Sequence, residues 1–269
     1  MSLGIVFKGP EGIVLAADSR VTLTAGIQID DQQMLLPATY DNATKLLRVN
    51  DQKFVGVVTH GLGVIGEREP RTAHSFVPEF EAQLSKEEAS RLSVEDFSSK
   101  LGDFFMCRWV GSMPKDYSGP DMTFLVGGYD EGAPYGKVFQ INIPRKPKPT
   151  ETTPAFGITW GGQRELTDRL IQGFDENLPW IIQQHLKLSD EQRDELRNHL
   201  KSNSSLRIPY QFLPLQDCVD LSISLIRVTI TLQTWLVGVR GVGGKIDVAT
   251  ITRTDGFTPI QQKKIRGEQ

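Results

Sequence analysis

The serine at position 2 has the chemical groups of a nucleophile that carries its own base. Removal of Met1 would leave Ser2 with a hydroxyl and a free α-amine on the same residue. An α-amine has a reference pKa of about 8, so at neutral pH part of it is unprotonated and can take the hydroxyl proton. Such a site also needs a nearby cation that lowers the amine pKa and a backbone N–H that donates to the oxyanion.

Lys45 could supply that cation, and Asp18 could supply the carboxylate that holds it in place. Asp18 ends a strand-like segment over 13–18, and Lys45 begins another over 45–49. A buried lysine held by a carboxylate on a neighbouring strand would lie close to the N-terminus of the first strand. The residue types alone also fit a turn-forming aspartate and a solvated lysine at a strand edge.

Other catalytic motifs are missing from the sequence. It has no Gly-x-Ser-x-Gly elbow, no His-Glu-x-x-His helix and no glycine-rich phosphate loop with a lysine. The four histidines have no partner at metal-ligand spacing, and we expect structural roles for His60, His74, His185 and His199. We therefore expect neither a metal nor a cofactor.

The elements that must position Ser2, Asp18 and Lys45 alternate between strands and helices. Eight strand-like segments are predicted, over 3–7, 13–18, 45–49, 54–58, 122–127, 137–143, 155–159 and 245–252. Helices are predicted from Ser93, from Arg164 and over 217–236, while the proline-rich stretch 144–154 indicates an exposed connection. This order favours an α+β fold with helices covering sheet faces.

We interpret residues 1–269 as one domain with a helical insertion. Ser189 and Gln192 form a capping-box pattern ahead of a charged helix, and we assign residues 178–214 to the insertion.

Charge and cysteine usage exclude several classes of protein. The 30 basic and 33 acidic residues are interleaved, with a net charge of −3, so neither nucleic acid nor a membrane is an expected partner. Cys107 and Cys218 lie in apolar helical stretches, which indicates buried thiols in a reducing compartment. We therefore expect a cytoplasmic protein.

Several blocks of the sequence resemble proteasome β subunits in the correct order. These blocks are residues 4–6, 12–20, 44–47, 125–130, 243–252 and 255–257, of which Gly243–Thr252 is the most specific. The resemblance implies a four-layer αββα sandwich of the N-terminal nucleophile hydrolase type. It also places Asp18 and Lys45 at the family's catalytic positions, with Arg20 as the companion of Asp18.

The same resemblance implies how a peptide would bind. Gly61 matches the glycine whose N–H donates to the oxyanion, and the backbone of Thr22 would pair with an extended peptide. Val21, Leu47 and Thr59 would line the pocket for the residue before the cut. Implied partners are a peptide or unfolded protein substrate and further copies of the chain in a ring, with a regulatory ATPase left open.

The chain departs from the family pattern at its nucleophile and at three supporting positions. The family's threonine is replaced by Ser2, which lacks the methyl group that restricts the rotamer. Val239 and Val242 stand where the family carries an Asp and a Ser, and Trp160-Gly161-Gly162 replaces a loop with a Ser that binds the amine.

The leading hypothesis from the sequence is a peptidase subunit with an N-terminal serine nucleophile, inside a ring. One alternative is a catalytically silent ring or scaffold subunit. Another is a non-proteolytic amidohydrolase or acyl transferase of the same nucleophile class.

Overall fold

The computed structural model describes residues 2–29, 32–67, 69–87, 90–264 and 267. Met1, whose removal the Ser2 hypothesis requires, lies outside the described residues. The side chains of residues 24–37 are not described either. The chain divides into two compact units, one formed by residues up to Gly162 together with those from Tyr210 onward, and one formed by Gln163–Pro209.

The first unit is built on two five-stranded sheets. The order of the first is β12-β1-β2-β13-β14, with β12 Gly157–Gly162, β1 Leu3–Lys8, β2 Ile13–Asp18, β13 Ile246–Thr252 and β14 Gly256–Gln261. The order of the second is β11-β10-β9-β6-β5, with β11 Lys146–Glu151, β10 Lys137–Ile143, β9 Met122–Gly128, β6 Val55–Gly61 and β5 Leu46–Leu47. All neighbouring strands with assigned register are antiparallel.

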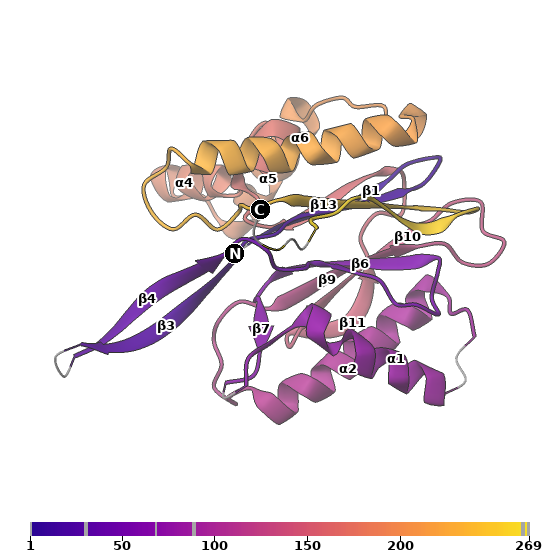
Figure 1. Cartoon of the computed structure of the whole chain (residues 1–269). Coiled ribbons are helices and arrows are strands. Elements are labelled where there is room, and N and C mark those ends of the chain that lie inside the picture. The colour runs from indigo at the N-terminus through magenta and orange to yellow at the C-terminus, as the bar shows by residue number, and fades with distance from the viewer. Residues whose placement is uncertain (1, 30–31, 68, 88–89, 265–266, 268–269) are drawn as a thin grey trace. The chain divides into compact units, whose positions relative to one another are not determined.

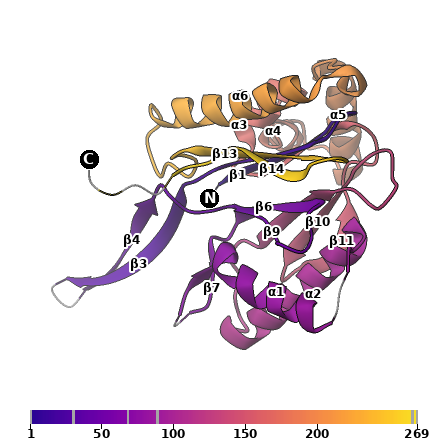
Figure 2. The same ribbon diagram turned by 45° about the vertical axis from the view of Figure 1, so that its right-hand side comes forward.

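Helices cover the outer face of each sheet in this unit. Helix α6 (Leu215–Gln233) lies along β2 and β13 of the first sheet, and α2 (Val94–Ser112) lies along β10 and β11 of the second, beside α1 (Val77–Lys86), as Figures 1 and 2 show. A 3₁₀ turn, η1 (Ala73–Phe76), precedes α1, and another, η2 (Tyr210–Phe212), precedes α6. The predicted four-layer αββα sandwich is confirmed.

The burial of β1 and β2 follows from these layers. Every residue of both strands is buried, because one face meets the helix layer and the other meets the second sheet. One hydrophobic cluster, which includes Val6, Leu15, Leu125 and Phe257, lies between the two sheets and contains residues of both. Another cluster packs the second sheet, that of β11-β10-β9-β6-β5, against α1 and α2. The two cores fix the positions of the strand ends at which the candidate site lies.

Two segments differ from the sequence-based expectation. The proline-rich stretch expected as a connection contains the edge strand β11, where Pro147 and Pro149 are half-buried and alternate with exposed Lys146 and Lys148. An edge strand tolerates proline because one side of its backbone needs no ladder hydrogen bond. Strands β3 (Val21–Ile29) and β4 (Gln32–Tyr40) pair as a long hairpin, which projects away from the two sheets in Figure 1.

The predicted burial of the two thiols is correct for Cys218 only. Cys218 is buried in α6, and burial raises the pKa of its thiol to about 11. Cys107 is exposed, because the buried face of α2 is formed by other residues, among them Leu101, Phe105 and Trp109.

The predicted helix from Ser93 is α2, and the Ser93 hydroxyl accepts a hydrogen bond from Asp96 N at 3.0 Å. Two short strands, β7 (Val64–Ile65) and β8 (Arg71–Thr72), pair ahead of η1.

The second unit consists of α3 (Glu165–Gln172), α4 (Asn177–Leu186) and α5 (Asp190–Ser204). The capping box predicted at Ser189 and Gln192 is formed at the start of α5. The interpretation of 178–214 as an insertion in one domain remains a prediction. Within the described residues, no helix has the length and apolar character to cross a membrane.

Gly102 sets how closely α2 can approach β11. A Cβ atom placed on Gly102 would lie 2.3 Å from the carbonyl oxygen of Pro147, which is backbone and cannot swing away. We expect Gly102→Ala to lower the free energy of unfolding by about 1–3 kcal/mol, as overpacking does in other cores. Chemical denaturation monitored by circular dichroism measures the change.

The matched control is Gly111→Ala in the same helix. A Cβ atom on Gly111 meets nothing within 4 Å, so the higher helix propensity of alanine should raise stability by up to about 1 kcal/mol. Equal effects at the two glycines would show that close packing at Gly102 does not limit the helix position.

Candidate active site

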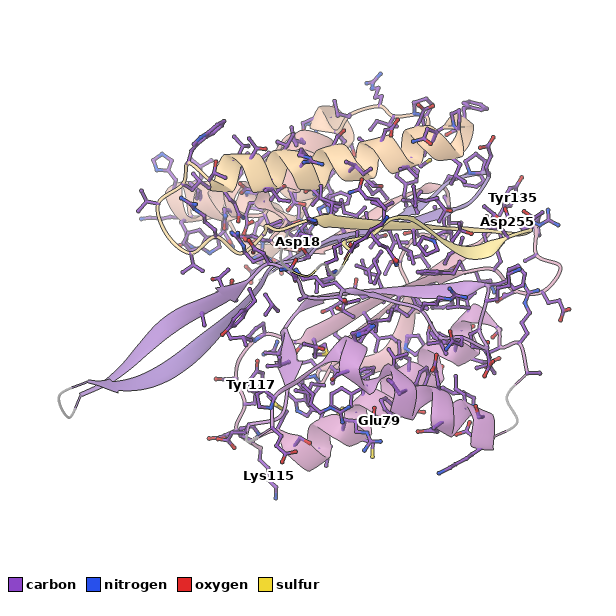
Figure 3. All side chains as sticks on the ribbon, viewed as in Figure 1. Asp18, Glu79, Lys115, Tyr117, Tyr135 and Asp255 are labelled. Atoms are coloured by element: carbon purple, nitrogen blue, oxygen red, sulfur yellow. The ribbon has the colours of Figure 1, made fainter. Side chains whose placement is uncertain are left out.

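The carboxylate of Asp18 is the centre of the candidate site. Asp18 ends β2, has no exposed surface, and lies inside the sandwich near the base of the β3–β4 hairpin in Figure 3. Its Oδ1 accepts hydrogen bonds from Leu3 N at 3.0 Å and from Lys45 Nζ at 2.6 Å. Its Oδ2 accepts from Arg20 N at 3.1 Å and from Gly243 N at 2.9 Å. Four donors thus compensate the cost of burying this charge.

The hairpin of β1 and β2 brings Ser2 to this carboxylate. Gly4 lies opposite Ala17 in the register, so Leu3 N reaches Asp18 at the open end of the hairpin. Ser2 comes one residue before β1 and is only 3% exposed. The hairpin therefore brings Ser2, one residue before Leu3, to the end of the sheet at which Asp18 pairs with Lys45.

Lys45 is held by its backbone as well as by its side chain. Its carbonyl accepts a hydrogen bond from Thr59 N at 2.9 Å, which ties the residue before β5 to β6. The side chain is 6% exposed, and burial lowers the pKa of its ammonium group below the ordinary lysine value, while Asp18 acts in the opposite direction. The pair is an internal ion pair rather than a solvated strand edge.

A narrow pocket unites the residues expected to act together. Its lining includes Ser2, Val21, Lys45, Thr59 and Gly61, and its volume is about 20 Å³, which is room for about one water molecule. A wider and more apolar depression of about 680 Å³ adjoins it and shares Val21, Ala43 and Thr72 with it.

The two remaining predicted substrate residues lie outside the narrow pocket. Leu47 is 1% exposed and packs in the core between the second sheet and helices α1 and α2. Thr22 lies on β3, where it is opposite Thr39 of β4. Among the described strands, β3 pairs with β4 alone, so no strand occupies its other edge.

Gly61 has a structural reason to be glycine. It has a φ of +85°, and a Cβ atom there would lie 2.2 Å from the carbonyl oxygen of Asp121. Leu62 N donates to the same carbonyl at 2.8 Å, which holds the turn after β6 against β9. Any side chain at residue 61 would displace this turn at the pocket wall.

Arg20 forms an ion pair that sequence reasoning missed. Its Nε and Nη2 donate to the two carboxylate oxygens of Asp41 at 2.5 and 2.8 Å, and Arg20 lowers the pKa of Asp41 through this hydrogen bond. Ser19 Oγ donates to the carbonyl of Asp41 at 2.6 Å. No pattern in the sequence pairs Arg20 with Asp41; strands β3 and β4, which lie between them in the chain, bring the two together.

The Gly243-Gly244 pair closes the site from the C-terminal side. A Cβ atom on Gly243 would lie 2.4 Å from Arg20 Cζ, and one on Gly244, whose φ is +72°, would lie 2.4 Å from the carbonyl of Asp41. Gly243 also accepts a hydrogen bond from Ser19 N at 3.1 Å. The backbone of Gly243 and Gly244, which begin the most specific motif of the sequence, thus packs closely against the Ser19–Arg20 turn and forms a hydrogen bond with it.

The structure shows what surrounds the residues at the positions that depart from the family pattern. Val239 is 48% exposed, whereas Val242 is 1% exposed and its N–H donates to Gln233 Oε1 at 2.9 Å. A Cβ atom on Gly161 would lie 2.3 Å from the His60 ring, and one on Gly162 would lie 1.9 Å from the Ser2 carbonyl oxygen. A serine in place of either glycine would collide with these groups.

The narrow pocket holds groups that can take part in hydroxyl chemistry. Within the described part of the chain, no group of three or more His, Cys, Asp or Glu side chains could hold a metal ion. The narrow pocket combines a buried hydroxyl, a buried ammonium group and a turn at Gly61 whose positive φ requires glycine.

Comparison with known proteins shows the fold and corrects the family assignment. No protein-family model and no curated protein matches the chain. Among solved structures, Anbu from Hyphomicrobium sp. strain MC1 is 14% identical with a TM-score of 0.53, and covers 97% of this chain and 86% of its own. The Anbu complex from Pseudomonas aeruginosa, solved as a helical assembly, is 14% identical with a TM-score of 0.55, covering 96% and 84%.

The assignment to the proteasome β-subunit family is therefore wrong as stated. The matched structures are Anbu proteins, which are related to that family but distinct from it. At this identity the likeness establishes the fold alone.

The Asp18–Lys45 pair generates a test of stability. We expect Lys45→Met to lower the free energy of unfolding by about 3–5 kcal/mol, because it leaves the Asp18 charge buried without its cation. Adding Asp18→Asn to this variant should recover part of the loss, since the uncompensated charge is then removed. Denaturant unfolding measures both.

The matched control is Lys100→Met, which breaks the half-exposed pair with Glu87 (2.6 Å). Such pairs contribute little to stability, so this variant should unfold almost as the parent protein does. A Lys45→Met variant as stable as the control would contradict the central role of the buried pair.

Proposed function

We propose that the protein is an N-terminal nucleophile hydrolase that cleaves peptide bonds with Ser2 once Met1 has been removed. The observation that carries the proposal is buried Lys45, which is paired with Asp18 and lines the narrow pocket together with Ser2 and Gly61. A buried cation beside an N-terminal hydroxyl residue is what lowers the pKa of an α-amine enough to act as a base.

Each group has a defined role in the proposed reaction. The Ser2 α-amine takes the hydroxyl proton, and Ser2 Oγ attacks the carbonyl carbon to give a tetrahedral oxyanion that accepts a hydrogen bond from Gly61 N–H. The amine then gives its proton to the leaving nitrogen as the C–N bond breaks. Water, deprotonated by the same amine, hydrolyses the acyl ester on Ser2. Lys45 tunes the amine pKa, and Asp18 and Arg20 hold the surrounding turn.

The open edge of β3 suits an extended peptide substrate. A peptide or unfolded segment would add to β3 through the Thr22 backbone, as peptides do at other exposed sheet edges. Val21 and Thr59 line the narrow pocket, and Leu23, Tyr40 and Val64 line the wider depression. These side chains favour an apolar residue near the cleaved bond. Because the narrow pocket holds only about 20 Å³, substrate binding requires it to widen.

We further propose that copies of the chain assemble. The loop after α6 exposes a continuous apolar run, in which Trp235 is 73%, Leu236 59% and Val237 105% exposed. A run of this kind is typical of an interaction surface. The helical assembly of the Anbu complex from Pseudomonas aeruginosa supports self-association within this fold.

A catalytically silent scaffold subunit is the second candidate. It is favoured by Val242, whose apolar side chain stands where the resemblance predicts a supporting serine, and by the 3% exposure of Ser2. In this reading the Asp18–Lys45 pair only stabilises the fold.

The peptidase proposal predicts a covalent adduct on Ser2. Intact mass spectrometry of the protein from its natural host should show loss of Met1, and a peptide epoxyketone should add to Ser2. Ser2→Ala should abolish both adduct formation and peptide cleavage, while Ser112→Ala, at an exposed serine at the end of α2, should leave them unchanged.

The outcome separates the two candidates. Retained Met1 with no adduct on a folded, assembled protein would reject the peptidase and support the scaffold. Cleavage that persists in Ser2→Ala would reject Ser2 as the nucleophile.

Self-association predicts a particle several times heavier than the 30.0 kDa chain. Light scattering should detect this particle at physiological salt. Val237→Asp should reduce the mass of the particle, because the substitution would bury a charge in the contact between copies. The control is Val110→Asp, at a valine that is 72% exposed in α2. A monomer for the parent protein, or equal effects of the two variants, would contradict assembly through this loop.

A further inference from the structure

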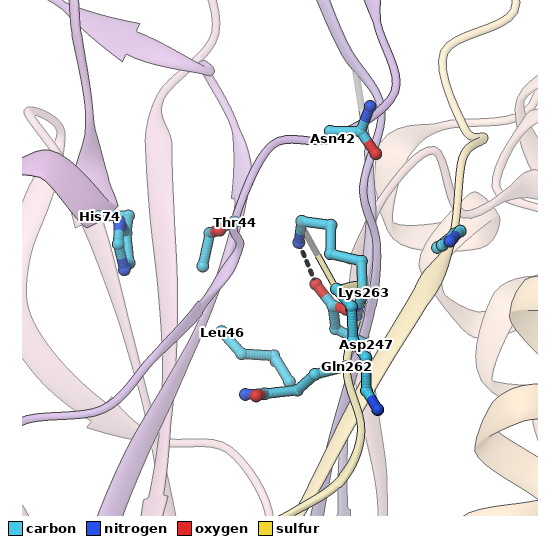
Figure 4. A pocket seen from close by; sticks show the side chains of 9 residues that line it. Asn42, Thr44, Leu46, His74, Asp247, Gln262 and Lys263 are labelled. Carbon is cyan, nitrogen blue, oxygen red and sulfur yellow. Dashed lines mark hydrogen bonds and ion pairs between the residues drawn. The ribbon is translucent and has the colours of Figure 1, made fainter. Parts of the chain in front are cut away.

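A second pocket, the lysine pocket, lies beside the segment that carries Lys45. It has a volume of about 560 Å³, and its walls come from the Asn42–Leu46 segment, η1, the start of β13 and the residues after β14. Figure 4 shows Thr44 and His74 on one side and Lys263 and Asp247 on the other. Four segments that are distant in the sequence therefore form one concave site.

The charges that line this pocket are mostly positive. Three lysines, Lys245, Lys263 and Lys264, line it together with a single carboxylate, Asp247. Asp247 accepts hydrogen bonds from both the backbone N and the ammonium group of Lys263, so these two charges compensate each other. Lys245 and Lys264 are exposed, and neither forms an ion pair with another described residue, so they leave two positive charges at the pocket.

Neutral hydrogen-bond donors complete the lining. The amides of Asn42 and Gln262 and the hydroxyl of Thr44 line the same pocket. In Figure 4 the side chains of Asn42 and Gln262 lie at opposite ends of the Lys263–Asp247 pair. The lining thus combines two uncompensated ammonium groups with polar groups that can donate to oxygen atoms.

We infer that the lysine pocket binds a dianionic phosphate group, either free phosphate or a phosphate monoester of a small molecule. Two uncompensated ammonium groups match the charge of such a dianion, and lysine binds phosphate as a point charge. The volume is within the range of small-molecule sites and exceeds what one phosphate fills, so it leaves space for an organic group. This inference does not depend on the proposed peptidase activity.

Calorimetric titration of the full chain with inorganic phosphate and with phenyl phosphate tests the inference. Both should bind saturably, and benzoate, which has one negative charge, should bind more weakly. Lys245→Gln combined with Lys264→Gln should weaken phenyl phosphate binding by about tenfold or more, because two charge-assisted contacts are lost. Gln262→Ala, which leaves the charge unchanged, should weaken it by a smaller factor.

The control removes two exposed lysines elsewhere. Lys86 and Lys115 are exposed outside the pocket, and Lys115 lies far from it at the lower edge of Figure 3. Lys86→Gln combined with Lys115→Gln should bind phenyl phosphate as the parent protein does, at the same ionic strength. An equal loss in both double variants would identify general surface charge and overturn the inference. Equal affinity for benzoate, or no saturable phosphate binding, would overturn it too.

Discussion

The burial of one carboxylate with four donors is the constraint on which the rest of the structure depends. A charge without solvent must have its oxygen atoms satisfied, and for Asp18 the donors come from the first strand, its own turn, Lys45 and the Gly243 loop. Each of these segments must therefore bring its donor group to the Asp18 carboxylate. The antiparallel register of the first sheet, the glycine pair before β13 and the salt bridge of Arg20 all serve this convergence.

Residue patterns predicted strands and helices that cover sheet faces, whereas the four-layer arrangement came from the family resemblance. The continuous apolar runs of β1 and β2 and the capped amphipathic helix at Ser93 were predicted from residue types alone, and their positions agree with the structure. Lys146–Glu151 escaped prediction because prolines are normally excluded from strands, and only its place at the sheet edge permits them. The pairing of β3 with β4 was likewise not predicted from the sequence.

The candidate site was predictable only where it follows strand ends. Ser2 and Lys45 line one pocket and Lys45 pairs with Asp18, since the β1–β2 hairpin and β5 fix their positions, while their catalytic roles remain a prediction. Asp41 could not be identified, because its partner Arg20 is brought to it by a hairpin the sequence did not reveal. The glycines at 161 and 162 are explained by the space that His60 and the Ser2 carbonyl occupy, which is a tertiary contact without any local pattern.

The sequence distances between the Asp18 partners have a consequence for folding. Leu3, Lys45 and Gly243 lie 15, 27 and 225 residues away from Asp18, so the last of these bonds forms only after almost the whole first unit has been synthesised. Contacts of such long range are late and slow in folding, because chain-closure entropy is lost before they form. During translation the nascent chain therefore lacks one donor to the Asp18 carboxylate until Gly243 has been synthesised, and Ser2 reaches its complete surroundings only after that point.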